Sequence, residues 1–433
     1  MKNKRYLFLL FCFPFFQCSN PKTIKKELKT KTKTTIVQTE DGYQLHVNGA
    51  PFFVKGAGIH NGNLEALARH GANAVRTWST ENGKAVLDQA HALGLKVMMG
   101  IWVQLERHGF DYDNPIAVGR QLDQIRKEVL ALKDHPALML WGIGNEMNLQ
   151  STNPKVWNAV NDISEMIHEL DPDHLTTTSL AGLDQTDIDL IKQRAPDLDF
   201  ICLQLYGPMD HLPDIIEGSG YDGPLMVTEW GATGYWEVPT TSWGAPIENN
   251  SSKKADLYLS RYQNGILTQT KQIMGSFVFL WGQKQERTPT WFGMFLPDGK
   301  ETESVDVMHY VWNNQWPENR TPRLVDFSLD GKKALDDIKL NPTNDYSAKV
   351  LIRDPDQDVL NYIWEIREES TSTKSGGDTE YIPAVIEGLF SSTADSTVTF
   401  RAPTKPGAYR LFIYVEDGQN HAAHANIPFF VEE

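Results

Sequence analysis

Between Thr35 and about Trp316, short apolar runs alternate with stretches whose apolar positions recur at helical spacing. Eight of these runs have the length and composition of buried strands: Phe53–Gly58, Asn73–Thr77, Lys96–Ile101, Leu138–Asn145, Leu175–Ser179, Phe200–Tyr206, Leu225–Glu229 and Ser276–Trp281. Amphipathic windows separate them, such as Gly83–Leu93, Gly119–Lys133, Val156–Leu170 and Ser252–Thr268. Eight strand-and-helix units over about 265 residues are typical of a (β/α)8 TIM barrel, an α/β fold. We therefore predict a barrel domain at residues 36–317.

Antiparallel β-structure is predicted on both sides of the barrel pattern. Within Thr35–Gly56, a hairpin is indicated by turn signals at Asp41-Gly42 and Asn48-Gly49. After the barrel, buried and exposed positions alternate around Trp364 and Tyr409. About 110 residues of this pattern suit an immunoglobulin-like β-sandwich. We place this second domain at residues 320–433, after a linker near Gln315–Thr321.

The first 35 residues have the pattern of an export signal. A positive stretch, Met1–Arg5, precedes the apolar run Tyr6–Phe16, which is too short to span a bilayer. With Cys18 directly after it, residues 1–18 resemble a bacterial lipoprotein signal, and an ordinary secretory signal cut nearby is the alternative. Residues 19–35 are rich in Lys and Thr and predict a tether. The expected location is the bacterial cell envelope, at the periplasmic face or cell surface, with a lipid anchor on Cys18.

Charge is distributed unevenly along the chain. Residues 1–35 contain nine lysines and arginines against one glutamate, so they carry +8 of a total of −15, and the rest carries −23. So acidic a body is a poor nucleic-acid binder and favours neutral over polyanionic substrates. The three cysteines form no metal or disulfide pattern. The acidic stretch Asp354–Asp358 is expected to be a solvated strand entry, a calcium loop being the alternative. We expect no metal and no cofactor.

Two predicted strands end in a carboxylate. The fourth ends at Asn145-Glu146 and the seventh at Thr228-Glu229. In a closed barrel the two ends face each other across the mouth, where function is located. A protonated and an ionised carboxyl group facing each other are what glycoside hydrolysis needs. Glu146 and Glu229 are therefore our candidate catalytic pair.

The same segments resemble a known clan. Asp134-His135-Pro136 with Leu138–Glu146, and Thr228-Glu229-Trp230-Gly231, are similar to the strand-four and strand-seven segments of retaining (β/α)8 glycoside hydrolases. The similarity is closest to the barrel of family 2 and weaker to family 5. By this resemblance Glu146 is the general acid/base, Glu229 the nucleophile and Asn145 a ligand of the sugar 2-hydroxyl, and further site positions are Arg76, Tyr206 and the strand-eight aromatic Trp281. Family 2 enzymes carry two β-domains before the barrel, whereas here the tether leads directly into it.

Indoles are concentrated in the barrel region, and several are predicted at or just past strand ends. Stacked on sugar rings, they would form subsites; the alternative is packing between strands and helices. Our candidates for substrate binding are Trp78, Trp102, Trp230 and Trp281, together with His60 and Gln204. Further cleft candidates are Glu106, His108, Gln283 and the loop 234–252.

The sequence thus predicts an envelope-anchored, monomeric, retaining β-glycosidase that acts on a neutral oligo- or polysaccharide, with β-glucan the first substrate to test. Two alternatives remain open. The same residues could catalyse transglycosylation, or the protein could be a glycan-binding lipoprotein without turnover. Retention of Glu146, Glu229, Asn145, Arg76 and Tyr206 argues against the second alternative.

Overall fold

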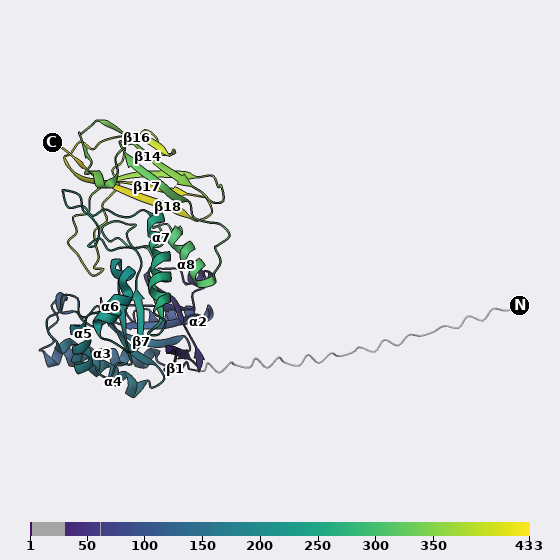
Figure 1. Ribbon diagram of the computed structural model, residues 1–433, viewed down its shortest axis with the longest axis vertical. Coiled ribbons are helices and arrows are strands. Elements are labelled where there is room, and N and C mark those ends of the chain that lie inside the picture. Colours follow the sequence, from purple (N-terminus) through teal and green to yellow (C-terminus); the bar gives the residue numbers. More distant parts are fainter. Residues whose placement is uncertain (2–30, 61) are drawn as a thin grey trace. The chain divides into compact units, whose positions relative to one another are not determined.

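The computed structural model describes residues 1, 31–60 and 62–433 (Figure 1). The predicted signal and the lipidation site Cys18 lie outside the described residues, as does most of the predicted tether. Within the described part of the chain, no helix combines the length and apolar character that crossing a bilayer requires.

An antiparallel three-stranded sheet comes first, made of β1 (Thr34–Thr39), β2 (Gly42–Val47) and β3 (Ala50–Pro51). Asn48 and Gly49 form its second turn with φ of 54° and 81°, as the sequence predicts. The first turn differs by one residue, because Gly42 already pairs with Thr39 and leaves Glu40 and Asp41 as the turn. Glycine is required at position 42, because φ is 121° there and an added Cβ would lie 2.2 Å from the carbonyl oxygen of Lys271.

Eight parallel strands then form a closed barrel, which confirms the predicted fold. They are β4 (Val54–His60), β5 (Ala74–Arg76), β6 (Lys96–Ile101), β7 (Leu138–Asn145), β8 (Leu175–Ala181), β9 (Phe200–Gln204), β10 (Leu225–Glu229) and β11 (Ile273–Gly282). Nearly all residues of these strands are buried, because the barrel interior covers one face and the helices cover the other.

Helices alternate with the strands: α1 (Leu64–Arg69), α2 (Gly83–Ala92), α3 (Pro115–Leu132), α4 (Lys155–Leu170), α5 (Gln185–Arg194), α6 (Leu212–Ser219), α7 (Ser251–Ser260) and α8 (Glu303–Asn313). The side chain of Asn114 caps α3 by accepting hydrogen bonds from the amides of Ile116 and Ala117. The predicted helix over Ser252–Thr268 is shorter than expected. After α7 the chain widens into a π turn at Arg261–Gly265 and then tightens into a 3₁₀ turn at Ile266–Thr268.

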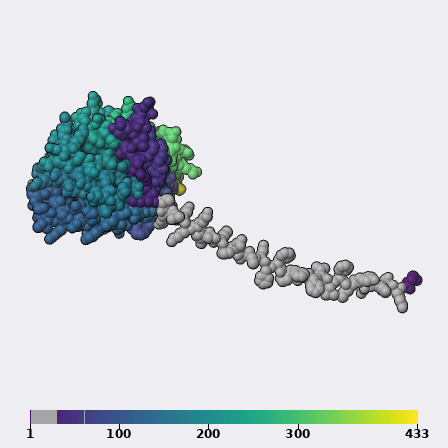
Figure 2. Space-filling model, turned by 90° about the horizontal axis from the view of Figure 1, so that it is seen from below, coloured from purple at the N-terminus to yellow at the C-terminus, as the bar shows by residue number. Residues whose placement is uncertain are grey.

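The N-terminal sheet covers the end of the barrel opposite the strands' carboxyl ends. Leu45 and Val47 of β2 are buried against side chains near the start of the barrel strands, including Met139, Phe200 and Met226. Seen from below, this N-terminal segment (purple) lies on the surface of the teal barrel (Figure 2).

Residues 31–35 belong to the folded body, which corrects the predicted tether boundary. Lys31 forms an ion pair with the buried Asp171 at 2.7 Å. Thr32 is buried, and its hydroxyl donates to the carbonyl of Pro136 at 2.6 Å. The Lys/Thr composition is typical of a tether, but the side chains of Lys31 and Thr32 form an ion pair and a hydrogen bond at the closed end of the barrel.

The C-terminal residues form two facing sheets, as predicted. One contains β12 (Arg323–Leu329), β14 (Asp345–Arg353) and β16 (Thr397–Arg401); the other contains β13 (Lys339–Leu340), β15 (Asn361–Glu368), β17 (Gly407–Glu416) and β18 (Ala422–Val431). Trp364 lies in the core between them, 3% exposed. The Asp354 carboxylate accepts amide hydrogen bonds from Asp356 and Asp358 of its own turn.

Barrel and sandwich share a buried polar cluster beside α7. Glu248 forms an ion pair with Lys254 at 2.5 Å and accepts a hydrogen bond from the Asn426 amide of β18 at 2.6 Å. Nearby, the buried Arg410 guanidinium of β17 donates to the carbonyl of Pro246 at 2.8 Å. These contacts fasten the loop after β10 to the sandwich.

Candidate active site

The carboxyl ends of four barrel strands bring polar side chains to one point. β5 ends at Arg76, β7 at Asn145, β9 at Gln204 and β10 at Glu229. Because the barrel strands are parallel, these four ends lie at the same mouth. Site residues predicted from four separate segments of the sequence are therefore neighbours in the structure.

Glu229 is buried in this mouth, and its carboxylate accepts four hydrogen bonds from the described residues. Oε1 accepts from Arg76 Nη1 at 2.7 Å, from Trp78 Nε1 at 2.7 Å and from Gln204 Nε2 at 2.9 Å. Oε2 accepts from the Tyr206 hydroxyl at 2.9 Å. One cation and three neutral donors suit an ionised carboxylate, the form in which a carboxyl group attacks as a nucleophile.

Tyr206 is held in its neutral, donating form. Burial raises the pKa of its hydroxyl well above the usual value, and the carboxylates of Glu229 and Glu146 raise it further. The phenol therefore keeps its proton over the working pH range and can donate to Glu229 throughout.

Asn145 is oriented by two donors. Its Oδ1 accepts from Arg76 Nη2 at 2.5 Å and from Gln204 Nε2 at 2.7 Å. With the carbonyl oxygen occupied, the amide NH2 is the group left to donate; it makes no hydrogen bond to another described residue. An NH2 group beside Glu229 is placed to donate to a sugar hydroxyl.

Glu146 has very different surroundings from Glu229. Its backbone adopts φ of 50°, a left-handed conformation that is uncommon outside glycine, and its amide donates to the Ser179 carbonyl at 2.9 Å. Its carboxyl group makes no hydrogen bond to the described residues. Burial and the charge of Glu229 raise its pKa to about 8, although the cations Arg107 and Arg76 act in the opposite direction. Glu146 therefore carries a proton near neutral pH, as a general acid must.

Two of the predicted sugar-binding indoles are buried elsewhere, which corrects the prediction. Trp230 follows Glu229 directly; because successive strand residues point to opposite faces, its ring packs outward against Tyr258 and Tyr262. Trp281 is fully buried, packed against Phe295 and with its Nε1 donating to the carbonyl of Asn63 at 3.0 Å. Neither ring presents a face to a ligand.

Three other indoles do lie at the mouth or beside it. Trp78 contacts Glu229 directly, and its ring lies under the Arg76 guanidinium at 5.0 Å. Trp102 follows the end of β6 and is 41% exposed. Trp236, in the loop after β10, is 55% exposed and contacts the Tyr206 ring edge-on at 5.7 Å. The rings of Trp102 and Trp236 are open to stack on sugar faces.

Charged groups after β6 and β11 also act on the site, and three of them were missed from the sequence. Arg107 and Glu286 both influence the pKa of Glu146, in opposite directions. Lys284 forms an ion pair with Glu286 at 3.2 Å, and its charge contributes to lowering the pKa of His60, after burial. His60 is the last residue of β4 and therefore lies at the mouth, as predicted. Arg107, Lys284 and Glu286 lie just beyond predicted strand ends, and this position was the signal in the sequence that could have identified them.

The remaining cleft candidates have structural partners. Glu106 accepts hydrogen bonds from Ser151, Thr152 and Asn153 in the loop after β7, and these hold its pKa at about 2. The Gln283 amide donates to the carbonyl of Pro289. His108 faces Asp378 of the sandwich at 3.3 Å. Within the described part of the chain, no three His, Cys, Asp or Glu side chains are grouped as a metal site.

Comparison with known proteins adds to this geometry. Residues 37–233 match the family described as glycosyl hydrolases family 2, TIM barrel domain. The chain is similar to the crystal structure of a β-glucuronidase of Bacteroides uniformis, with 13% identity and a TM-score of 0.50 over 92% of this chain and 48% of the other. It is also similar to a Bacteroides fragilis protein provisionally assigned as a β-galactosidase, with 14% identity and a TM-score of 0.50 over 92% and 57%. For a β-glucuronidase of Ruminococcus gnavus the identity is 16% and the TM-score 0.51 over 65% and 53%.

At these identities the solved structures support the fold alone. This chain also spans only about half the length of those proteins. The family match, by contrast, covers the segments that carry Arg76, Asn145, Glu146, Tyr206 and Glu229.

Proposed function

We propose that this chain, whose residues 37–233 match the TIM-barrel domain of family 2 glycosyl hydrolases, is a retaining β-glycosidase that hydrolyses a neutral β-linked glycan. The observation that carries this proposal is the contrast between two carboxyl groups at one barrel mouth. Glu229 accepts four hydrogen bonds from donors, whereas Glu146 accepts none within the described residues and has a raised pKa.

The contrast supports double displacement. Glu146 protonates the leaving oxygen while Glu229 attacks the anomeric carbon, which gives a covalent glycosyl-enzyme. Formation of that ester removes the negative charge of Glu229. Since this charge is a cause of the raised pKa of Glu146, the pKa of Glu146 then falls, and the same group can take a proton from the attacking water.

Two other polar groups support binding of the same sugar. The Asn145 amide NH2 is free to donate to the 2-hydroxyl, because its oxygen is held by Arg76 and Gln204. The exposed rings of Trp102 and Trp236 supply apolar faces for further sugar units.

The pairing of two nearby cations, Arg76 and Lys284, favours a neutral sugar over a uronic acid. Arg76 is held by Glu229 and Asn145, and Lys284 by Glu286 and the carbonyl of Gly377. A sugar carboxylate would therefore meet two cations that are already neutralised, with Glu286 close by. Arg107, whose buried Nε and Nη1 make no hydrogen bond to the described residues, is left as an unpaired cation acting on Glu146. β-Glucan remains the first substrate to test.

The test measures release of reducing sugar from β-glucans, β-mannans and aryl β-glycosides, with an aryl β-glucuronide included. Both Glu146→Ala and Glu229→Ala should lose polysaccharide hydrolysis. Azide should restore turnover of an activated aryl glycoside in Glu229→Ala and give a glycosyl azide of inverted configuration. Activity that survives Glu229→Ala would contradict the proposed nucleophile, and preferential cleavage of the glucuronide would contradict the neutral substrate.

Transglycosylation by the same residues is distinguished by products. Longer oligosaccharides in a digest that contains an added acceptor would identify it. Glycan binding without turnover in wild type and both variants would instead indicate a non-catalytic glycan-binding protein.

We also propose that the protein is held at the bacterial cell envelope through a lipid on Cys18. The basis is the sequence pattern of residues 1–18. Labelling with a fatty-acid analogue should mark the wild type and not Cys18→Ser, and labelling of both would contradict the proposed anchor site.

A further inference from the structure

A long segment of the sandwich, residues 368–386 between β15 and β16, reaches the barrel mouth. Polar contacts to several loops attach it there. The Lys284 ammonium donates to the carbonyl of Gly377 at 2.6 Å, and the Arg287 amide donates to the Glu380 carboxylate at 2.8 Å. The Tyr235 hydroxyl donates to the carbonyl of Lys374 at 3.1 Å, and His108 faces Asp378 at 3.3 Å. The segment is thus fastened to loops that follow β6, β10 and β11.

These loops are the ones that surround the catalytic pair. Arg287 follows Glu286, whose charge acts on Glu146, and its guanidinium lies over the Tyr235 ring at 4.3 Å. Tyr235 in turn contacts the exposed Trp236. The sandwich segment therefore borders the active-site mouth.

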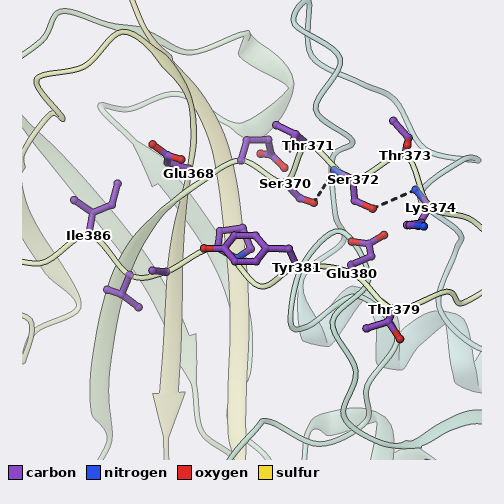
Figure 3. A pocket seen from close by; sticks show the side chains of 14 residues that line it. Glu368, Ser370, Thr371, Ser372, Thr373, Lys374, Thr379, Glu380, Tyr381 and Ile386 are labelled. Carbon is purple, nitrogen blue, oxygen red and sulfur yellow. Dashed lines mark hydrogen bonds between the residues drawn. The ribbon is translucent and has the colours of Figure 1, made fainter.

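The segment contains a hollow of about 590 Å³, within the size range of small-molecule sites (Figure 3). Its lining is made only of residues from this segment. In the close-up view, the ring of Tyr381 lies across the hollow between Ser370 and Ser372 on one side and Ile386 on the other. Tyr381 is 78% exposed, which leaves its ring open.

Hydroxyl groups line the hollow and can still donate. Ser370 Oγ accepts the amide of Ser372, and Ser372 Oγ accepts the amide of Lys374, so both hydroxyl protons remain available. Three threonine hydroxyls of the lining make no hydrogen bond to another described residue; they belong to Thr371, Thr373 and Thr379.

The carboxylates of the lining are paired with cations. Glu369 binds the buried Arg410 at 2.9 Å, Glu368 lies 3.4 Å from Lys405, and Glu380 lies 3.8 Å from the Arg287 guanidinium. The lining also contains Lys374, whose ammonium can donate to hydroxyl oxygens. The hollow is therefore suited to a ligand rich in hydroxyl groups, with one apolar face that packs on an aromatic ring.

We propose that this hollow is a second saccharide site, which binds a neutral sugar unit of a glycan chain beside the active-site mouth. That the glycan is the substrate rests on the proposed function. The apolar face of a sugar ring packs on Tyr381, and serine and threonine hydroxyls bind its hydroxyls. The sandwich then holds a polysaccharide next to the barrel, which raises affinity for polymers over short substrates.

The first test is electrophoresis of the full chain through native gels that contain soluble β-glucan, β-mannan or no polysaccharide. Tyr381→Ala should weaken retardation at least threefold in apparent Kd, whereas Tyr381→Phe keeps the ring and should remain close to wild type. Ile382→Ala is the matched control, because Ile382 is 54% exposed and adjacent but does not line the hollow. Equal melting temperatures of the variants check that each is folded.

The second test compares kcat/KM on the polysaccharide with kcat/KM on an aryl β-glycoside. The ratio should fall at least fivefold in Tyr381→Ala and stay unchanged in Ile382→Ala. Retardation of Tyr381→Ala equal to wild type, or no retardation of wild type in either polysaccharide gel, would overturn the second site. Retardation that depends on Tyr381 without any hydrolysis by wild type would leave the site standing and overturn the proposed function.

Discussion

The two catalytic candidates have the same functional group and opposite surroundings. Glu229 is stabilised by Arg76 and three neutral donors, whereas Glu146 is desolvated and lies near the charge of Glu229. Burial without a hydrogen bond favours the protonated form. The proposed roles of acid and nucleophile thus rest on the surroundings of the two groups, and they can be tested by titration.

We expect kcat/KM for a glycoside with a poor leaving group to fall above about pH 8, as Glu146 loses its proton. Glu146→Gln cannot titrate, so its residual activity on a dinitrophenyl glycoside, which needs no acid, should lack this alkaline limb. pH–rate profiles of the two proteins check this. The same alkaline limb in Glu146→Gln would assign it to another group.

Glu146 should also make stability depend on pH. In the folded protein it keeps its proton up to about pH 8, whereas in the unfolded chain it ionises near the ordinary value of 4.5. Between these values the folded state binds more protons, so the free energy of unfolding falls as pH rises. Glu146→Gln should gain on wild type by up to about 1 kcal/mol per pH unit in this range. Urea unfolding at pH 5, 6.5 and 8 measures the difference; a constant offset would contradict it.

At the scale of single residues, the sequence predicted the polar side chains around Glu229 better than the sugar-binding indoles. Arg76, Asn145, Gln204, Tyr206 and Glu229 meet as expected. Trp230 and Trp281 do not join them. Alternation along the strand places Trp230 opposite Glu229, but the partners of Trp281 come from distant segments, which periodicity does not reveal.

Single strands and helices are where hydrophobic periodicity is most informative. β6, β7 and β10 begin and end at the predicted residues, because each is an uninterrupted apolar run. The π turn after α7 was not predicted, since the apolar spacing of Ser252–Thr268 looks helical throughout. The conformation of the loops at the mouth depends on contacts with residues far away in the sequence, so periodicity does not predict it.

Close packing between β5 and β6 gives a test at the element scale. A Cβ added to Gly100 of β6 would lie 2.3 Å from the carbonyl oxygen of Thr77 and 2.6 Å from the backbone of Trp78. Gly100→Ala must therefore displace the segment that holds Trp78 against Glu229. We expect a loss of about 1–3 kcal/mol in unfolding free energy and at least a tenfold loss of kcat.

Gly119→Ala is the matched control, because Gly119 is an exposed position inside α3 with open space around it. This change should raise the unfolding free energy by about 0.5–1 kcal/mol and leave kcat unchanged. Denaturant unfolding and steady-state kinetics on both variants provide the comparison. Full activity of Gly100→Ala would mean that this segment can shift without loss of the site.

For the molecule as a whole, the barrel and the sandwich depend on each other through buried charge. Burial alone would raise the pKa of Glu248, but Lys254 and several hydrogen-bond donors bring it to about 2. Asn426 of the sandwich is one of its donors. The sequence predicted both domains, but this coupling arises only when their surfaces meet.

We expect Glu248→Ala to cost about 3–5 kcal/mol in unfolding free energy, because Lys254 is left as an unpaired buried charge. Asp345→Ala, which removes an exposed ion pair with Arg401, should change it by less than about 1 kcal/mol. Guanidinium unfolding of both variants measures the contrast. Similar small losses in both would show that water reaches Lys254.

The way the chain enters the barrel has a consequence for how the protein can be handled. Lys31 and Thr32 contact Asp171 and Pro136, which precede β8 and β7 and therefore lie at the end of the barrel away from Glu146 and Glu229. Coupling to a solid support upstream of Lys31 would hold the molecule by the end of the barrel that lies away from Glu146 and Glu229. The barrel mouth would then face the bulk solution, where the proposed glycan substrates could reach it without passing the support.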